Sequence, residues 1–259
     1  MQYIVFFVRV IEKKMTSLPP SECCAKVAYQ QGTPSGHIEI ISTLKCYVSS
    51  NYTTNSDKYL LIFTDVFGIE LLNNKLLGDH FAQQLGYPVI IPDILFDDPL
   101  SEGSTDFQRF FANHPVDKTK KCVFNFLSSF KDTFPHATFI AGIGYCFGAK
   151  YLCHHLTESG IIDVGAFAHP SYIEEDEFSM IKKPLLISAA ENDPVFTRES
   201  RVKSEEILKC LNIPYQIDLF GGVYHGFAVR GDLSKKQVKY ASEKAFSDAV
   251  YWFKYHAEN

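Results

Sequence analysis

From about residue 37 onwards, the chain alternates short apolar runs with longer segments in which apolar residues recur at helical spacing. Short apolar runs predict buried strands, and helical spacing predicts helices that bury one side. Strands are expected at residues 59–63, 88–91, 137–143, 164–169, 184–188 and 215–220. Strands that alternate with helices are typical of a mostly parallel sheet covered on both faces.

Residues that begin or end helices support the helices expected between these strands. Leu77, Phe81 and Leu85 share one side of a helix, and Gly86 is placed to end it. Further helices are expected at residues 117–134, 147–156 and 197–210, and a long helix near the C-terminus carries apolar residues from 238 to 252.

Two segments are expected to be irregular. Residues 97–116 form the longest such stretch, which we expect to cap a site, and residues 32–36 are expected to turn between two short N-terminal strands. No linker, repeat or low-complexity segment interrupts the alternation. We therefore expect residues 15–259 to form one α/β domain, a three-layer α/β/α sandwich with a mostly parallel central sheet.

The first residues do not follow this alternation. Positions 3–8 are apolar, but Arg9 interrupts the run and charged residues follow, so it is too short for a signal peptide or a membrane span. We interpret residues 1–14 as an extension that the domain does not need. The alternative is an extra edge strand of the sheet.

The composition is that of a soluble globular protein, with 46% hydrophobic residues, 21% charged residues and a net charge of -5. No block of Lys and Arg concentrates positive charge, which argues against a nucleic-acid partner. Seven irregularly spaced cysteines without a Cys-x-x-Cys motif indicate free thiols in a reducing compartment, here the cytoplasm. Cys23 and Cys24 are expected to point apart on an extended chain, and neither a metal site nor a cofactor is expected.

A candidate nucleophile stands at a junction of strand and helix. Residues 144–148 read Gly-Tyr-Cys-Phe-Gly, the pattern of a nucleophile elbow with Cys146 in the central position. Side chains at Gly144 and Gly148 would collide with neighbours on such a strained turn. The helix that begins at Phe147 would stabilise negative charge on the thiolate and on an oxyanion.

An acid and a histidine follow in the chain order of α/β-hydrolases. Asp193 comes just after a predicted strand, and His225 comes just after the last one. We expect Asp193 to orient His225, with Glu191 as the alternative acid. The acidic residues 174–177 are interpreted as a solvated helix face.

These residues resemble the dienelactone hydrolase family, also called carboxymethylenebutenolidases, over about residues 30–256. The resemblance rests on Asp65-Val66-Phe67-Gly68, on the elbow at 144–148, on Asp193 and on His225-Gly226-Phe227-Ala228. It implies an α/β-hydrolase fold and a triad. In that triad Cys146 attacks an ester or lactone carbonyl, His225 moves the proton and Asp193 orients the imidazole.

The resemblance also implies roles for residues around the triad. The backbone N–H groups of Val66 and Phe147 would bind the oxyanion, and Asp65 would hydrogen-bond the resting thiol. Family enzymes that open dienelactone hold its carboxylate with two arginines. Here Asp97 stands at the position of one arginine, and Arg230 lies one residue beyond the position of the other.

The sequence therefore predicts a cysteine-dependent hydrolase of a small-molecule ester, lactone or thioester, without naming dienelactone as the substrate. Asp97 is expected to repel a substrate carboxylate, so neutral substrates should be preferred unless Arg230 or Arg109 compensates. Two alternatives remain, a non-catalytic binding module of the same fold and a redox-responsive protein in which Cys146 is oxidised. No membrane partner is expected, and the protein is expected to be a monomer or a homodimer.

Overall fold

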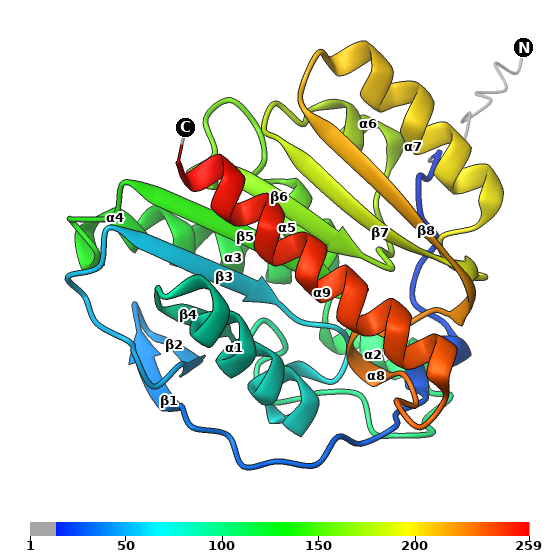
Figure 1. The fold of residues 1–259 in the computed structure, drawn as a ribbon, viewed down its shortest axis with the longest axis horizontal. Coiled ribbons are helices and arrows are strands. Elements are labelled where there is room, and N and C mark those ends of the chain that lie inside the picture. The colour runs from blue at the N-terminus through cyan, green and yellow to red at the C-terminus, as the bar shows by residue number, and fades with distance from the viewer. Residues whose placement is uncertain (1–13, 259) are drawn as a thin grey trace, which may run out of the picture.

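The computed structural model describes residues 14–258, which form an eight-stranded sheet with helices on both faces (Figure 1). The strands, in their order across the sheet, are β1 (His37–Ile41), β2 (Leu44–Val48), β4 (Val89–Pro92), β3 (Lys58–Phe63), β5 (Phe139–Tyr145), β6 (Val164–Ala168), β7 (Leu185–Asn192) and β8 (Tyr215–Tyr224). From β4 to β8 neighbouring strands are parallel, whereas β2 is antiparallel to both β1 and β4.

The helices pack on both sides of this sheet. They are α1 (Leu72–Leu85), α2 (Phe107–Asn113), α3 (Val116–Ser128), α4 (Phe130–Thr133), α5 (Phe147–Cys153), α6 (Glu175–Ser179), α7 (Arg198–Leu211), α8 (Phe227–Arg230) and α9 (Lys236–Ala257), with the short 3-10 helices η1 (Glu22–Ala25) and η2 (Gly68–Glu70). Helices α1 and α9 cover one face, and α3 and α5 cover the other (Figure 1). This architecture is the α/β-hydrolase fold, which confirms the predicted fold class.

The six strands predicted from apolar runs are all present, with shifts of a few residues at their ends. Every residue of β5 and β6 is buried, because helices cover both faces of the sheet. Gly86 ends α1 in the left-handed conformation with φ 83°, as predicted. The carboxyl ends of the parallel strands meet at one edge of the sheet (Figure 1). Side chains that follow different strands can therefore converge there.

The N-terminal hairpin differs from the prediction. Residues 32–36 do not separate two strands, because β1 begins only after them and pairs with β2. The turn between these strands consists of Ser42 and Thr43, with φ 50° and 72°. The left-handed conformation is uncommon for a β-branched residue, so this turn gives no glycine signal in the sequence.

The described chain is already packed at its beginning. The carbonyl oxygen of Lys14 accepts the N–H of Glu175 at 2.9 Å, and Met15 forms an antiparallel bridge with Glu174. Residues 1–13, which carry most of the expected extension and the alternative edge strand, lie outside the described residues. The dispensability of residues 1–14 therefore stays a prediction.

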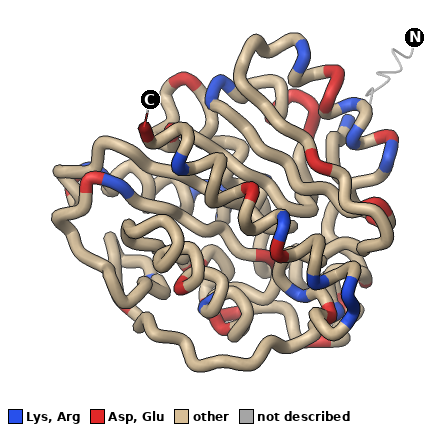
Figure 2. Tube along the Cα trace, viewed as in Figure 1, with Lys and Arg blue, Asp and Glu red and all other residues tan. Residues whose placement is uncertain are grey.

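Charged residues of both signs are interspersed along the described chain (Figure 2). None of its helices combines the length and the apolar character that crossing a lipid bilayer requires. The net charge is -5, and the sheet edge that carries the predicted site residues has both acidic and basic groups near it.

Candidate active site

Cys146 lies on a strained turn between β5 and α5, with φ 49° and ψ -112°. A Cβ atom on Gly144 would lie 2.5 Å from Cα of Ala149, and one on Gly148 would lie 2.1 Å from the carbonyl oxygen of Phe63. Non-bonded atoms do not approach so closely. Both glycines are therefore required by close backbone packing, as the elbow pattern predicted.

The ends of β7 and β8 supply the acid and the histidine. Oδ1 of Asp193 accepts the backbone N–H groups of Val195 and Phe196, both at 2.8 Å, so the carboxylate is held on its own turn. His225 Nδ1 lies 3.0 Å from Oδ1 and 2.8 Å from Oδ2 of Asp193. Since the Asp193 carboxylate can only accept a hydrogen bond, Nδ1 of His225 carries the proton, and Nε2 points away from Asp193.

Glu191, the alternative acid, is placed differently. It is exposed, and its carboxylate accepts the backbone N–H of Gly222 at 2.6 Å. Asp193, by contrast, has a fully buried side chain in contact with His225. The geometry therefore favours Asp193 over Glu191 as the partner of the imidazole.

The second nitrogen of His225 faces a pair of sulfur atoms. Within the described residues His225 Nε2 has no hydrogen-bond partner. A ring nitrogen of His225 and the sulfur atoms of Cys24 and Cys146 all lie within 4.8 Å of one another. The sulfur of Cys146 is 3.6 Å from the sulfur of Cys24 and 3.6 Å from Oγ of Ser171. Asp193, His225 and Cys146 are thus arranged in series.

This arrangement favours a thiolate beside an imidazolium. Burial raises the pKa of Cys146, but the hydrogen bond with Cys24 and the charges of His225 and Arg230 outweigh it, so that the pKa is well below its usual range. Burial lowers the pKa of His225, whereas Cys146 and Asp193 raise it to about 10. The thiolate is the nucleophilic form of cysteine.

The two expected oxyanion donors belong to segments that touch. A Cβ atom on Gly148 would overlap the carbonyl group of Phe63, so the start of α5 packs directly on the end of β3. Val66 comes three residues after Phe63, and Phe147 is the first residue of α5. Both are fully buried. Their backbone N–H groups are therefore candidates to bind one oxygen atom next to Cys146.

A buried ion pair lies close to the thiol. Arg230 Nε is 2.7 Å from Oδ2 of Asp65, and the two side chains are 1% and 0% exposed. Among the described residues, the hydrogen bonds of the Cys146 sulfur go to Cys24 and Ser171. The structure therefore differs from the expected contact between Asp65 and the resting thiol, because Asp65 binds Arg230 instead.

Residues 22–28, which we name the cover, lie over Cys146. Arg230 Nη1 donates to the carbonyl oxygens of Cys24 at 2.6 Å and Lys26 at 3.0 Å. This N-terminal part of the chain runs along the sheet edge where the parallel strands end (Figure 1). Cys146 is 0% exposed beneath it, so the structure shows a closed site.

The cover was not found from the sequence. Its two cysteines lie in η1 with their sulfur atoms 3.9 Å apart, which corrects the expectation that Cys23 and Cys24 point apart on an extended chain. The position of the cover depends on hydrogen bonds from Arg230, which is about 200 residues away in the chain. No local pattern in the sequence indicates such contacts.

A cavity of about 860 Å³ lies beside the histidine. The cover, the ends of β7 and β8, α8 and the region where α9 begins all contribute to its wall. Apolar, basic and acidic side chains share this wall, including Val27, Phe227, Val238, Lys26, Arg230, Lys235 and Asp232. Arg230 Nη2 has no hydrogen-bond partner within the described residues, so it keeps a free donor.

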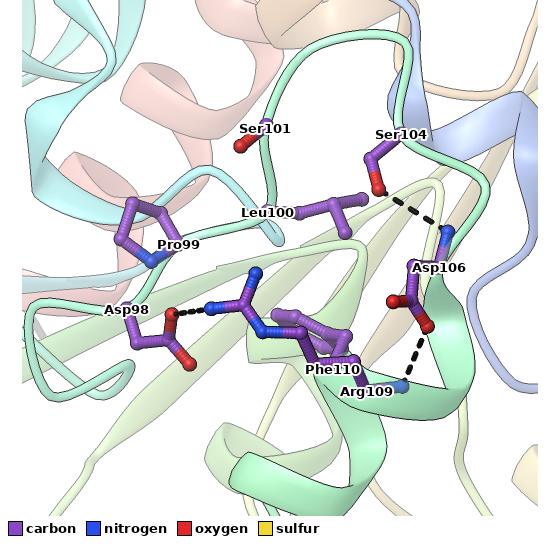
Figure 3. Close-up of a pocket in the computed structure, with 8 residues that line it drawn as sticks. All are labelled: Asp98, Pro99, Leu100, Ser101, Ser104, Asp106, Arg109 and Phe110. Carbon is purple, nitrogen blue, oxygen red and sulfur yellow. Dashed lines mark hydrogen bonds and ion pairs between the residues drawn. The ribbon is translucent and has the colours of Figure 1, made fainter.

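The segment expected to form a cap contains α2 and packs against the elbow helix. The ring of Phe110 lies 5.3 Å from the ring of Phe147 at an angle of 74°. Figure 3 shows Arg109 reaching Asp98 across a cavity of about 20 Å³, with Nη2 2.8 Å from Oδ1. Arg109 is therefore paired at the surface and does not line the cavity beside His225.

Asp97 does not line that cavity either. Its side chain is 63% exposed, and Oδ1 lies 2.5 Å from Nζ of Lys45. The expectation that Asp97 repels a substrate carboxylate is corrected by this placement. The carboxylate is directed to solvent and to a neighbouring lysine, because the chain turns at Phe96 and Asp97 with φ 57° and 58°.

The acidic segment 174–177 is not simply a solvated helix face. Lys150, which is 0% exposed on α5, places Nζ 2.8 Å from both carboxylate oxygens of Glu177 and 3.5 Å from Glu174. His154 Nε2 also contacts Glu177 at 2.6 Å. A buried ammonium group needs such partners. These contacts fasten the elbow helix to α6.

His169 lies at the site, although the sequence predicted it only as the last residue of a buried strand at 164–169. Its ring lies 5.0 Å from the ring of His225 at 64°, and neither ring nitrogen has a hydrogen-bond partner within residues 14–258. Burial and the charge of His225 hold the pKa of His169 well below its usual range. His169 is therefore a neutral ring packed against His225. Its position directly after β6 was the available signal.

Residues 45–257 match the model of the dienelactone hydrolase family. Hydrolase pyvD from Aspergillus violaceofuscus is 40% identical over 242 residues, which cover 92% of this chain and 98% of that protein. Hydrolase tropI from Talaromyces stipitatus is 38% identical over 250 residues, covering 92% and 97%.

A solved structure of carboxyl esterase 2 from Tuber melanosporum is similar with a TM-score of 0.61 at 13% identity, and the alignment covers 88% of this chain and 89% of that one. At this level of identity the likeness concerns the fold.

Proposed function

Since this chain belongs to the dienelactone hydrolase family and is an ester-hydrolysing enzyme, we propose that Cys146, His225 and Asp193 carry out the reaction. The proposed substrate is a small-molecule carboxylic ester, lactone or thioester. The observation that carries the proposal is the buried pair of Asp193 and His225, with the His225 ring within 4.8 Å of the sulfur of Cys146.

The first step is attack of the Cys146 thiolate on the carbonyl carbon of the substrate. The carbon–oxygen π electrons move to the oxygen, and the N–H groups of Phe147 and Val66 stabilise the oxyanion. When the intermediate collapses, His225 gives its Nε2 proton to the leaving oxygen or sulfur. The acyl group then remains on Cys146 as a thioester, and His225 is neutral.

The second half of the reaction restores the enzyme. Neutral His225 removes a proton from a water molecule, and the resulting hydroxide attacks the thioester carbonyl. Collapse of this second intermediate releases the acid and the Cys146 thiolate beside the newly formed imidazolium. Asp193 keeps the proton on Nδ1 throughout, so Nε2 is always the nitrogen that exchanges protons.

The substrate enters from the cavity of about 860 Å³, and the cover must move because Cys146 is 0% exposed in the closed state. The apolar residues of the cavity wall suit a hydrocarbon acyl or alcohol group. Arg230 Nη2, with no protein partner among the described residues, can donate to a substrate oxygen. Arg230 Nε can stay paired with Asp65 at the same time.

A panel of fluorogenic esters, lactones and thioesters tests the proposal on wild type and on Cys146→Ala. We expect hydrolysis by wild type and none above background by Cys146→Ala. Cys210→Ser is the matched control, since Cys210 is an exposed thiol on α7. Hydrolysis that survives in Cys146→Ala would place the chemistry elsewhere. Binding without hydrolysis of any substrate would favour the non-catalytic module.

A further inference from the structure

Three cysteine sulfur atoms form a row that starts at the proposed nucleophile. The sulfur of Cys146 is 3.6 Å from that of Cys24, which is 3.9 Å from that of Cys23. Cys24 and Cys146 are both 0% exposed, whereas Cys23 is partly exposed and lines the cavity. The hydrolysis proposed above needs only one of these three thiols.

We propose that Cys24 is a resolving thiol for Cys146, so that a peroxide converts the enzyme reversibly into a form with a disulfide between Cys24 and Cys146. The inference goes beyond the proposed function, because it assigns a second reaction to the same sulfur atom. It rests on the distance between the two sulfurs, on their shared burial and on the cationic groups around them.

The first oxidation step consumes one peroxide. The Cys146 thiolate attacks one oxygen of hydrogen peroxide, the oxygen–oxygen bond breaks, and hydroxide leaves, so that Cys146 becomes a sulfenic acid. Hydroxide then takes a proton and becomes water. The positive charges of His225 and Arg230 stabilise the thiolate that this step requires.

The second step uses the thiol of Cys24. Its sulfur attacks the sulfur of the sulfenic acid, the sulfur–oxygen bond breaks, and the released hydroxide takes the Cys24 proton to form a second water. The two thiols together lose two electrons and two protons. One peroxide is reduced to two waters, and no other oxidant is needed.

The geometry permits this bond with a small movement. A disulfide has a sulfur–sulfur length of about 2.05 Å, so the two atoms must approach by roughly 1.5 Å from their present 3.6 Å. Cys24 lies in a four-residue 3-10 helix within an otherwise irregular segment, and rotation of its side chain supplies part of the approach. Arg230 already holds the backbone of Cys24 in place.

A bond between Cys23 and Cys24 is the competing outcome. Their sulfurs are 3.9 Å apart, but a disulfide between adjacent residues closes a very small ring and departs from the usual geometry. Cys24 has a single sulfur atom, so it can form a disulfide with either Cys23 or Cys146 but not with both. The shorter distance and the absence of such a small ring favour Cys146.

The disulfide would have two effects on the enzyme. It removes the nucleophile, and it fixes the cover across the site through a covalent bond. It also keeps Cys146 from further oxidation to sulfinic acid, which most thiol reductants do not reverse. A reductant that reaches the cavity would restore both thiols.

Peptide mapping by mass spectrometry tests the proposal on wild type, Cys24→Ser, Cys23→Ser and the control Cys210→Ser, after exposure to hydrogen peroxide. We expect a linked Cys24–Cys146 peptide in wild type, Cys23→Ser and Cys210→Ser, which dithiothreitol removes. In Cys24→Ser we expect Cys146 to gain two or three oxygen atoms instead, and dithiothreitol should not reverse this. Near-ultraviolet circular dichroism verifies that Cys24→Ser is folded.

The proposal is overturned if Cys146 is overoxidised equally in wild type and Cys24→Ser, if Cys146 is not oxidised at all, or if the linked peptide joins Cys23 to Cys24. This readout does not depend on turnover. Loss of the disulfide with normal hydrolysis would refute only the resolving thiol, whereas hydrolysis by Cys146→Ala would refute only the proposed function.

Discussion

The site has two parts that are held in place by different means. Cys146, Asp193 and His225 each follow a strand of the same parallel sheet, and backbone pairing along β5, β7 and β8 fixes where they meet. The cover has no strand, and a few scattered hydrogen bonds hold it instead, some of them between backbone groups. Arg230 binds two of its carbonyl oxygens, and Asn73 Nδ2 binds the carbonyl oxygen of Ala28 at 2.9 Å.

This difference indicates which part of the site can move. The strand ends are tied into the buried centre of the molecule, so shifting them would break many backbone hydrogen bonds. The cover depends on a few scattered bonds, which join it to Arg230, Asn73 and Gly103. We therefore expect the triad to be rigid and the cover to be the element that opens for substrate.

The largest expected effect concerns the rigid part. We expect His225→Ala to lower kcat by roughly 10⁴-fold or more and Asp193→Asn by about 10⁴-fold, because members of such a triad act as a unit. Steady-state kinetics with the best substrate of the panel measures both. Glu191→Gln is the matched control and should be close to wild type. A silent Asp193→Asn together with an inactive Glu191→Gln would refute the assignment of the acid.

The next effect concerns the attachment of the cover. Arg230→Met leaves the buried Asp65 carboxylate without its partner, and breaking a buried pair in this way costs about 3–5 kcal/mol of the free energy of unfolding. It also frees the carbonyl oxygens of Cys24 and Lys26. Urea titration should show the loss of stability, and iodoacetamide should label Cys146 faster than in wild type.

The double variant Asp65→Asn with Arg230→Met separates the two consequences. It removes the unpaired charge, so part of the stability should return while Cys146 stays easier to label. If labelling returned to the wild-type rate, the cover would not be held by Arg230.

A smaller effect is expected from pH. Because the pKa of His225 is raised to about 10 in the folded state, its protonated ring beside Cys146 and Asp193 contributes stability that is fully present below the unfolded value near 6.5 and is lost as pH rises through about 10. We expect kcat/KM to fall about tenfold per unit above that pH.

Cys146→Ser sharpens this test. A neutral serine no longer raises the pKa of His225, so any residual activity should follow a titration at lower pH. An unchanged alkaline limb in Cys146→Ser would show that the fall belongs to another group.

The smallest effect is expected at Asp97. Its pairing with Lys45 is at the surface, where such contacts contribute about 0–1 kcal/mol, and it does not line the cavity. Asp97→Arg should therefore change kcat/KM for an anionic and a neutral ester by the same small factor. A selective gain of about tenfold for the anionic ester would restore the view that this position contacts substrate.

The part of the site that follows strands was predictable from the sequence. Continuous apolar runs mark strands buried on both faces, and the residues directly after them meet at one edge. Glycine at 144 and 148 added a local steric signal, which the close contacts of both positions explain.

The rest depends on contacts between distant residues. The pairing of Lys150 with Glu177, of Arg230 with Asp65 and of Lys45 with Asp97 joins groups that no short motif relates. From the sequence, Glu177 was interpreted as solvated, and the family resemblance placed Asp97 and Arg230 near a substrate carboxylate. The hairpin turn at Ser42 could not be predicted for a local reason. Its two residues are not of the Asn-Gly or Asp-Gly type that usually marks such turns.

The strained backbone of Cys146, with φ 49° and ψ -112°, lowers the thermodynamic stability of the protein at the residue that carries the reacting sulfur. A residue in such a conformation costs on the order of 1–3 kcal/mol, and glycine would relieve most of it. Cys146→Gly and Cys146→Ala both lose the thiol, but only glycine relieves the strain, so Cys146→Gly should melt at a higher temperature than Cys146→Ala. Among non-reactive residues at this position, selection for folding alone would then favour glycine, and a non-reactive version of this fold is best made with that substitution.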